Sequence, residues 1–113
     1  MKTFKHLNYN DAVDRLVNGI KKDYAKWTTS GYGIDKFNEG LSVKSGRKFD
    51  KVLHGGSVWG FVAKKGGVHK GIPYNVGDVF KAASWRAPAK WARGSIFDKN
   101  QNWFRWTGPD YLI

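Results

Sequence analysis

Residues 82–94 carry the strongest chemical signal in the sequence, because aromatic rings and cations alternate within one short segment. The segment contains two indoles and three cations, which belong to Trp85, Arg86, Lys90, Trp91 and Arg93. Pro88 and Gly94 are expected to interrupt a regular helix or strand, so we predict an irregular loop with projecting side chains. Planar rings beside cations suit a flat, negatively charged partner, and nucleic acid is the commonest such partner.

A second basic stretch precedes this segment. Residues 64–71 are polar and rich in glycine, and they include Lys64, Lys65 and Lys70. We expect a loop whose lysines extend a phosphate-binding groove, and a plain hairpin connection is the structural alternative. In the nucleic-acid interpretation the bases stack on Trp85 or Trp91, the cations hold phosphates, and little sequence preference is expected.

The indoles also have an ordinary structural interpretation. Six tryptophans in a small domain are more often part of the core than of a binding surface, and we expect Trp59 and Trp106 to be core residues. Trp85 and Trp91 flank Pro88 among charged residues, so for them the two interpretations are nearly balanced. Arg93 could equally be a structural arginine that binds backbone carbonyls.

The residues that usually carry catalysis show no organised pattern. The three histidines, His6, His54 and His69, lie in unrelated segments without metal-ligand spacing, and there is no cysteine. We therefore predict no catalytic residue, no metal site and no cofactor. The enzyme that stays open as an alternative is a small basic nuclease, with His54 or His69 as base and Arg86 or Arg93 holding phosphate.

Composition fits a folded, polyanion-binding domain. The chain has 113 residues, of which 41% are hydrophobic and 16% aromatic, so it is not an intrinsically disordered polymer, and we expect a single domain over residues 1–113. Its formal net charge is +11. Twelve of the 20 Lys and Arg residues, but only three of the nine Asp and Glu residues, lie in residues 41–99. Such a field attracts phosphate polymers in a salt-dependent way, although a merely solubilising surface is the simpler explanation.

The element with the clearest periodicity is a helix over residues 10–27. Its apolar residues recur at helical spacing and are Val13, Leu16, Val17, Ile20, Tyr24 and Trp27. Asn8 or Asn10 can cap its start, and Gly19 weakens its middle without preventing it. Residues 34–41 indicate a short second helix or a turn, with Asp35 as a candidate cap.

The remainder of the chain favours short strands. We predict strands at 48–53 and 57–63, a turn into a strand at 76–80 in which Asp78 serves the turn, and strands at 95–97 and 103–106. Gly60 marks a bulge or a close backbone approach. The expected fold is α+β, with an N-terminal amphipathic helix packed on a small twisted antiparallel sheet or partly open barrel of four to five strands.

The sequence contains no apolar run long enough for a membrane helix and no signal-peptide pattern at its start. Together with the absence of cysteine, this predicts a protein of the cytoplasm without a membrane partner.

Several segments together resemble small uncharacterised proteins of tailed bacteriophages. The segments are 37–41, 58–62, 76–78, 81–85, 87–89, 92–94 and 106–109, which span roughly the last two thirds of the chain. No activity is attached to such proteins, so the resemblance assigns no functional residue. It implies a phage or prophage origin and action inside an infected bacterium on DNA, RNA or a host protein.

The hypothesis from sequence is therefore non-catalytic binding of DNA or RNA through residues 82–94. Two alternatives use the same chemistry. The Trp and Arg side chains could anchor an inhibitor to an acidic host protein, or a pocket under the loop could hold a small anionic nucleotide.

Overall fold

The structure is a computed structural model that describes residues 8–28 and 33–110. Two helices come first, α1 (Tyr9–Trp27) and α2 (Ile34–Gly40). The strands that follow are β1 (Leu41–Lys44), β2 (Phe49–His54), β3 (Ser57–Ala63), β4 (Gly67–His69), β5 (Ile72–Tyr74), β6 (Asp78–Ala82), β7 (Pro88–Ser95), β8 (Phe104–Arg105) and β9 (Gly108–Pro109).

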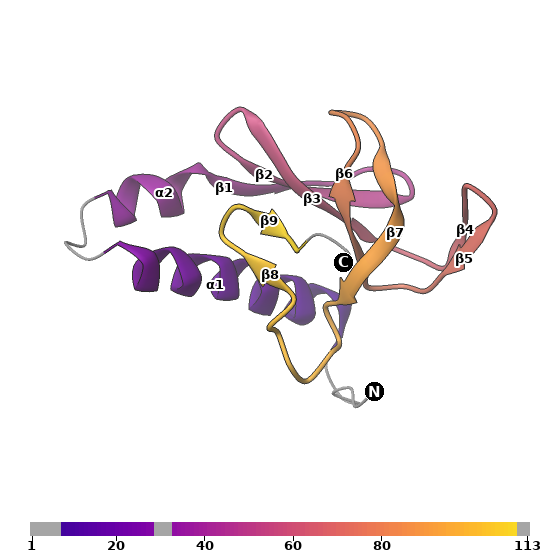
Figure 1. Ribbon diagram of the computed structural model, residues 1–113, viewed down its shortest axis with the longest axis horizontal. Helices are drawn as coiled ribbons and strands as arrows, with labels where there is room; N and C mark the ends of the chain where they lie inside the picture. The colour runs from indigo at the N-terminus through magenta and orange to yellow at the C-terminus, as the bar shows by residue number, and fades with distance from the viewer. Residues whose placement is uncertain (1–7, 29–32, 111–113) are drawn as a thin grey trace.

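The strands form one open sheet and two small hairpins. Five strands lie in the order β1-β2-β3-β6-β7, and every neighbouring pair is antiparallel. The hairpins are β4–β5 and β8–β9. Helix α1 runs beneath the sheet, and β8–β9 lies on the same side (Figure 1). The predicted α+β class is confirmed, and the sheet is open rather than closed into a barrel.

Helix α1 forms where the sequence predicts it. The side chain of Asn8 accepts a hydrogen bond from the backbone N–H of Asp11 at 2.8 Å, which caps the first turn. Its buried face consists of Ala12, Val13, Leu16 and Ile20. In α2 the capping residue is Gly33 with φ 81°, not Asp35, because the chain enters that helix through the left-handed region.

Strand alternation sends Val52, Val62 and Val79 to the face that α1 covers. The register between β2 and β3 shifts between Val52 and Leu53, so Trp59 has no partner on β2 and turns toward this core. Trp59 is 4% exposed, and its Nε1–H donates to the Arg105 carbonyl at 3.0 Å. The prediction of a core role for Trp59 is confirmed.

The β8–β9 hairpin is held between α1 and the sheet. The buried Phe104 ring packs on Gly19 so closely that a Cβ there would lie 2.9 Å from the Phe104 Cζ. A larger residue at Gly19 would therefore have to push the Phe104 ring aside. Trp106 is only partly buried against the same core.

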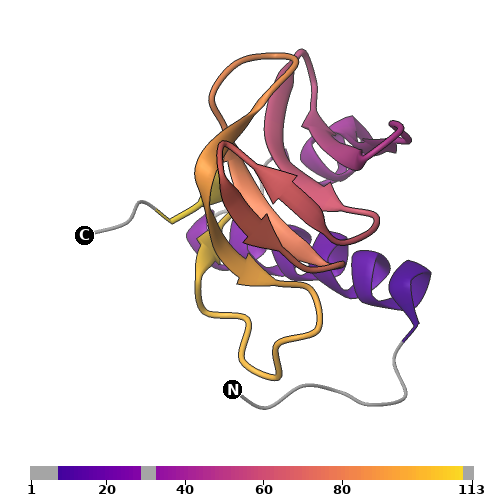
Figure 2. The ribbon, with the colours of Figure 1, turned by 90° about the vertical axis from the view of Figure 1, so that its right-hand side faces the viewer.

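The opposite face of the sheet has its own smaller cluster. Phe61 on β3 pairs with Phe80 on β6, and both are buried with Tyr74 from β5. The β4–β5 hairpin projects from one end of the molecule (Figure 1) and lies toward the viewer when that end is seen face-on (Figure 2). The apolar cluster is therefore local, and part of this face stays open around it.

Most predicted strands are confirmed, with three corrections. Residues 82–94 are not one irregular loop, because β7 runs from Pro88 to Ser95 and only residues 83–87 are loop. Pro88 is tolerated because it is the first residue of the strand, and the irregularity appears instead as register shifts between β6 and β7. Residues 64–71 contain a hairpin strand, β4.

The third correction concerns residues 95–97, which do not form a separate strand. Ser95 ends β7, and the Asp98 carboxylate accepts its backbone N–H at 3.0 Å, so the chain turns at once. The predicted strand at 103–106 is shorter than expected, with Phe104 buried and Arg105 exposed. The turn at Asp78 is confirmed, since its carboxylate accepts the Asn75 N–H at 3.0 Å. Within the described ranges, neither helix has the length and hydropathy to cross a membrane.

The α1 packing gives a first prediction. Leu16→Ala removes a fully buried side chain and should lower the free energy of unfolding by about 2 to 5 kcal/mol, measured by urea denaturation. Asn18→Ala, on the exposed side of the same helix, should change it by less than about 0.5 kcal/mol. Equal effects of the two substitutions would contradict this packing.

Candidate nucleic-acid interface

The loop between β6 and β7 presents the first predicted indole. It is closed by two backbone hydrogen bonds, from the N–H groups of Ala83 and Ser84 to the Ala87 carbonyl, at 2.9 and 3.2 Å. At its tip the Trp85 side chain is 49% exposed. The core interpretation of Trp85 therefore does not apply, and half of its surface is open to a partner.

The loop places Trp85 beside a cation from a distant strand. The Nζ atom of Lys51 on β2 lies 4.5 Å from the centroid of the Trp85 ring and 5.7 Å from that of Phe61. An ammonium held between two aromatic rings is a cation–π arrangement that fixes both the charge and the indole. Trp85 therefore belongs to a surface that combines β2, β3 and the β6–β7 loop.

Sequence reasoning missed Lys51, although one signal for it was present. In β2 the neighbouring Asp50 and Val52 are buried, so alternation already directed Lys51 to the other face. Its contact with Trp85 depends on the strand order, which the sequence did not provide.

Electrostatic repulsion is built into this face. Lys44 on β1 is the Cα partner of Lys51 on β2, so two like charges lie directly opposite each other. Such a pair destabilises a sheet.

The second predicted indole lies on the edge strand β7. Trp91 is 49% exposed, and the Nζ atom of Lys90 lies 5.5 Å from its ring centroid. The register with β6 shifts between Phe80 and Ala82, which leaves this part of β7 without regular partners. Both indoles therefore combine about half exposure with a neighbouring ammonium group.

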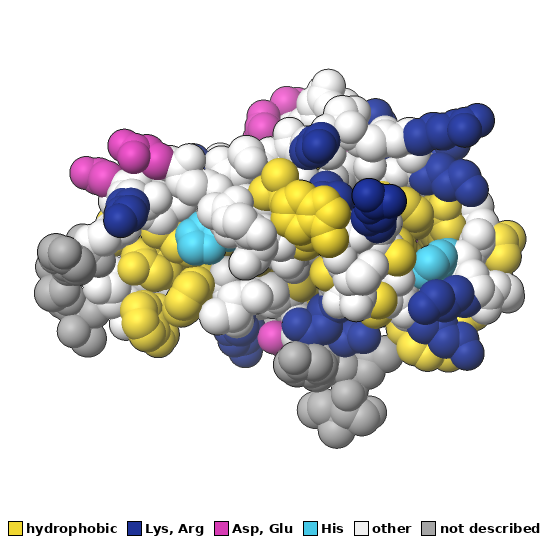
Figure 3. Space-filling model, turned by 90° about the horizontal axis from the view of Figure 1, so that it is seen from above, with side chains coloured by type: hydrophobic (Ala, Val, Ile, Leu, Met, Phe, Trp, Pro, Cys, Tyr) yellow, Lys and Arg dark blue, Asp and Glu magenta, His cyan; other side chains and the backbone are white. Residues whose placement is uncertain are grey.

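The cations around the indoles are not neutralised by nearby carboxylates. Arg86 is exposed, and its backbone N–H contacts the Ser84 Oγ at 3.3 Å. In the part of the chain that the structure describes, no carboxylate forms an ion pair with Lys51, Arg86 or Lys90. Their charge is available to an external anion. Lys and Arg side chains surround exposed apolar surface on this face (Figure 3).

Arg93, on β7, binds backbone carbonyls, as the structural alternative expected. Its Nε–H donates to the Trp91 carbonyl at 3.1 Å, and its Nη1 donates to the Asp110 carbonyl at 2.9 Å. The pKa of Lys81 is lowered mainly by burial and in addition by repulsion from the Arg93 charge. The guanidinium thus joins β7 to the segment after β9, and we expect it to support the surface rather than bind phosphate.

Lys64 is likewise held by its own protein. Its Nζ donates to the Ser45 Oγ at 2.7 Å and lies 3.6 Å from a carboxylate oxygen of Asp50. Asp50 is buried and accepts the Tyr9 hydroxyl at 2.8 Å, and burial together with this bond raises the pKa of Tyr9. This network joins α1 to the sheet.

Lys65 and Lys70 remain exposed beside the β4–β5 hairpin. Lys70 lies in its turn with φ 52°. The hairpin contacts the start of β7, where a ring nitrogen of His69 lies 3.1 Å from the Pro88 carbonyl. These two lysines therefore extend the basic surface from the side of the hairpin.

The histidines of the nuclease alternative lie on opposite faces of the sheet. His54 packs on Phe37 of α2, on the side of the sheet that faces the helices, with ring centroids 4.2 Å apart. His69 packs near Phe80 in the opposite cluster, at 6.0 Å. His6 lies outside the described residues. Among residues 8–28 and 33–110, no group of three His, Cys, Asp or Glu side chains could hold a metal ion.

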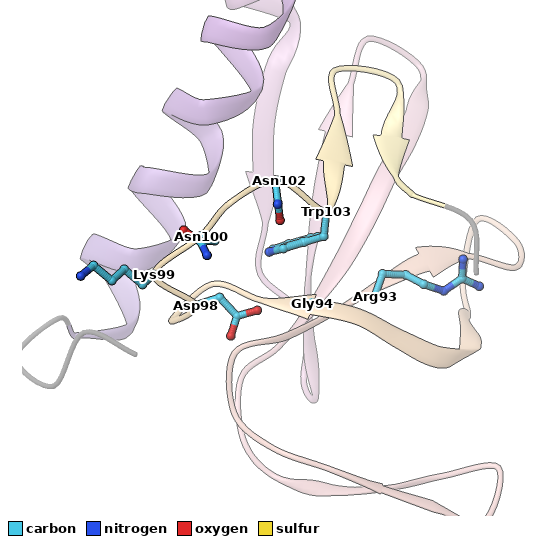
Figure 4. Close-up of a pocket in the computed structure, with 7 residues that line it drawn as sticks. All are labelled: Arg93, Gly94, Asp98, Lys99, Asn100, Asn102 and Trp103. Atoms are coloured by element: carbon cyan, nitrogen blue, oxygen red, sulfur yellow. The ribbon is translucent and has the colours of Figure 1, made fainter. Parts of the chain in front are cut away.

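Two hollows lie away from the indole surface. One, of about 420 Å³, lies between β7 and residues 98–103 and includes Asp98 and Trp103 (Figure 4). The other, of about 560 Å³, lies between α1, α2 and β2 and is aromatic, with Trp27 63% exposed at its border and Trp106 in its wall. Sequence reasoning predicted neither. The second is assembled from separate elements, and the first, although its lining lies within residues 93–103, depends on how the turn after β7 folds back on that strand.

Comparison with known proteins gives one match, a family model that covers residues 2–111. The chain belongs to DUF7717, a family of unknown function. No curated protein and no solved structure matches the chain. Inference about its activity therefore rests on the geometry of its own residues.

The two arginines of the predicted site should differ in what they stabilise. Arg93→Ala loses two hydrogen bonds from a charged donor and should lower the free energy of unfolding by about 1.5 to 3 kcal/mol. Arg86→Ala, at an exposed position, should change it by less than about 0.5 kcal/mol. Urea denaturation of both variants measures the difference, and a loss of stability confined to Arg86→Ala would reverse the assignment.

Proposed function

We propose that this protein binds nucleic acid without catalysis, through a surface formed by Lys51, Trp85, Arg86, Lys90 and Trp91. The observation that carries the proposal is that both predicted indoles are about half exposed and that each has an ammonium group within 5.5 Å of its ring centroid. Lys44, Lys65 and Lys70 add exposed charge around this surface.

The chemistry of the surface fits a flexible polyanion with flat bases. Stacking of a base on an exposed indole contributes about 1 to 3 kcal/mol, and each ammonium that replaces counterions on a phosphate adds a salt-dependent term. Neither interaction distinguishes one base from another. The proposed binding is therefore strongest at low salt and shows little sequence preference at the indoles.

The proposed setting is the cytoplasm of a bacterium, with a phage or prophage origin as the sequence resemblance implies. Single-stranded DNA and RNA are the preferred ligands, because unpaired bases can reach the indoles. The alternative partner is an acidic host protein, for which the same exposed indoles would serve as interface anchors.

Fluorescence anisotropy with labelled single-stranded DNA, single-stranded RNA and duplex DNA tests the proposal. Trp85→Ala should weaken binding of single strands by about 1 to 3 kcal/mol, since it removes one stacking ring. The matched control is Trp27→Ala, which removes an exposed indole next to Tyr24 and Trp106 at the end of α1 and should leave binding unchanged.

The salt dependence of the same titrations provides a second readout. Removing one phosphate contact with Lys51→Ala should reduce the slope of log K against log salt by about 0.7 to 0.9. Absence of binding at low salt, or an equal loss in Trp27→Ala and Trp85→Ala, would reject the surface. The test would then move to protein partners.

A further inference from the structure

Beyond the indole surface, the structure contains a second group of buried polar atoms, at the hollow beside β7. Asp98 is 5% exposed, and one of its carboxylate oxygens accepts the Ser95 N–H. Its other oxygen, Oδ1, is buried without a hydrogen-bond partner among the described residues. The indole Nε1–H of Trp103 is also buried without a hydrogen-bond partner among the described residues. Buried polar atoms are normally paired, so an unpaired acceptor and donor in one hollow require an explanation.

The position of the Trp103 ring is fixed by the backbone beneath it. A Cβ at Gly94 would lie 2.3 Å from the ring, so the indole rests directly on β7 and only glycine fits there. Phe104 contacts the ring edge-on, with centroids 5.0 Å apart. The nitrogen edge of Trp103 points to the side of the hollow where Asp98 and Asn100 lie (Figure 4).

The border of the hollow is polar and positively charged. Lys99 is exposed and points outward, and the exposed Asn100 and Asn102 flank the opening (Figure 4). Asp98 Oδ1 and Trp103 Nε1 are both buried, so a ligand that pairs with them must displace the atoms that cover them. A volume of about 420 Å³ falls within the range of small-molecule sites.

We propose that this hollow holds one nucleobase. The base donates an N–H to Asp98 Oδ1 and accepts the Trp103 Nε1–H, while Lys99 contacts the attached phosphate. A base taken out of a stack is bound through hydrogen bonds to its Watson–Crick edge, which carries both donors and acceptors.

The inference rests on the proposed function in one respect, namely that the base is part of a bound strand. Gly94 lies three residues after Trp91 on β7, roughly 10 Å along the strand, so a chain stacked at Trp91 can reach the hollow.

Isothermal titration calorimetry with AMP, GMP, CMP and UMP, and with inorganic phosphate, tests the pocket itself. At least one mononucleotide should bind more tightly than phosphate. Trp103→Phe keeps the ring on Gly94 and removes only the N–H, so it should weaken that binding about tenfold. Asp98→Asn should weaken it similarly, and Trp27→Ala, at the end of α1 and outside this hollow, should leave it unchanged. Unfolding curves establish that each variant is folded.

Single-base oligonucleotides in the anisotropy assay identify the source of the base. If Trp103→Phe weakens both mononucleotide and strand binding, the base comes from a strand; if only mononucleotide binding falls, it comes from a free nucleotide. Either result supports the pocket. It is overturned if no mononucleotide binds more tightly than phosphate, or if Trp103→Phe and Asp98→Asn bind as the native protein does. Strand binding that depends on Trp85 alone would leave the proposed function standing without the pocket.

Discussion

The arrangement of this protein depends on the burial of one face of the sheet against α1. Leu16 and Ile20 are fully buried against strand residues that include Val52 and Val62, and this apolar contact determines which side chains alternation sends to the other face. Lys51 lies between the buried Asp50 and Val52 of β2, so the packing of this face against the helix directs a cation to the other side. The basic surface is thus a consequence of the core. A one-residue shift in the register of β2 would turn Lys51 toward the core and Val52 toward the other face.

The same constraint explains where the structure accepts unfavourable contacts. Lys44 faces Lys51 without an ion-pairing carboxylate among the described residues, and two indoles stay half exposed although a small core could use them. Proteins commonly break local rules where they function. By contrast, Arg93 and Lys64 satisfy backbone and carboxylate groups of their own protein and stabilise the frame around that surface.

The sequence was sufficient for the elements with strong local signals and insufficient for the contacts between elements. Helix α1, β2 and β3 follow from periodicity and from their bounding glycines and asparagines, because these signals are local. The sequence did not predict the strand at residues 88–95, because Pro88 and Gly94 usually indicate a loop. In the structure Pro88 is the first residue of the strand, and the strand's register with β6 shifts. The Lys51–Trp85 contact joins residues far apart in the chain, and no local pattern encodes such a contact. The pocket at Asp98 is lined by residues 93–103, and it depends on how the turn after β7 folds back on that strand.

The central claim, that a polyanion binds over Trp85 and Trp91, is tested most directly by the indole N–H resonances of a ¹⁵N-labelled sample. Six tryptophans give separate signals, and single Trp→Phe variants assign them. On titration with single-stranded DNA at low salt, the signals of Trp85 and Trp91 should shift, and those of buried Trp59 and of Trp27 should remain in place. Shifts confined to Trp27 and Trp106, or no shifts at all, would contradict the account.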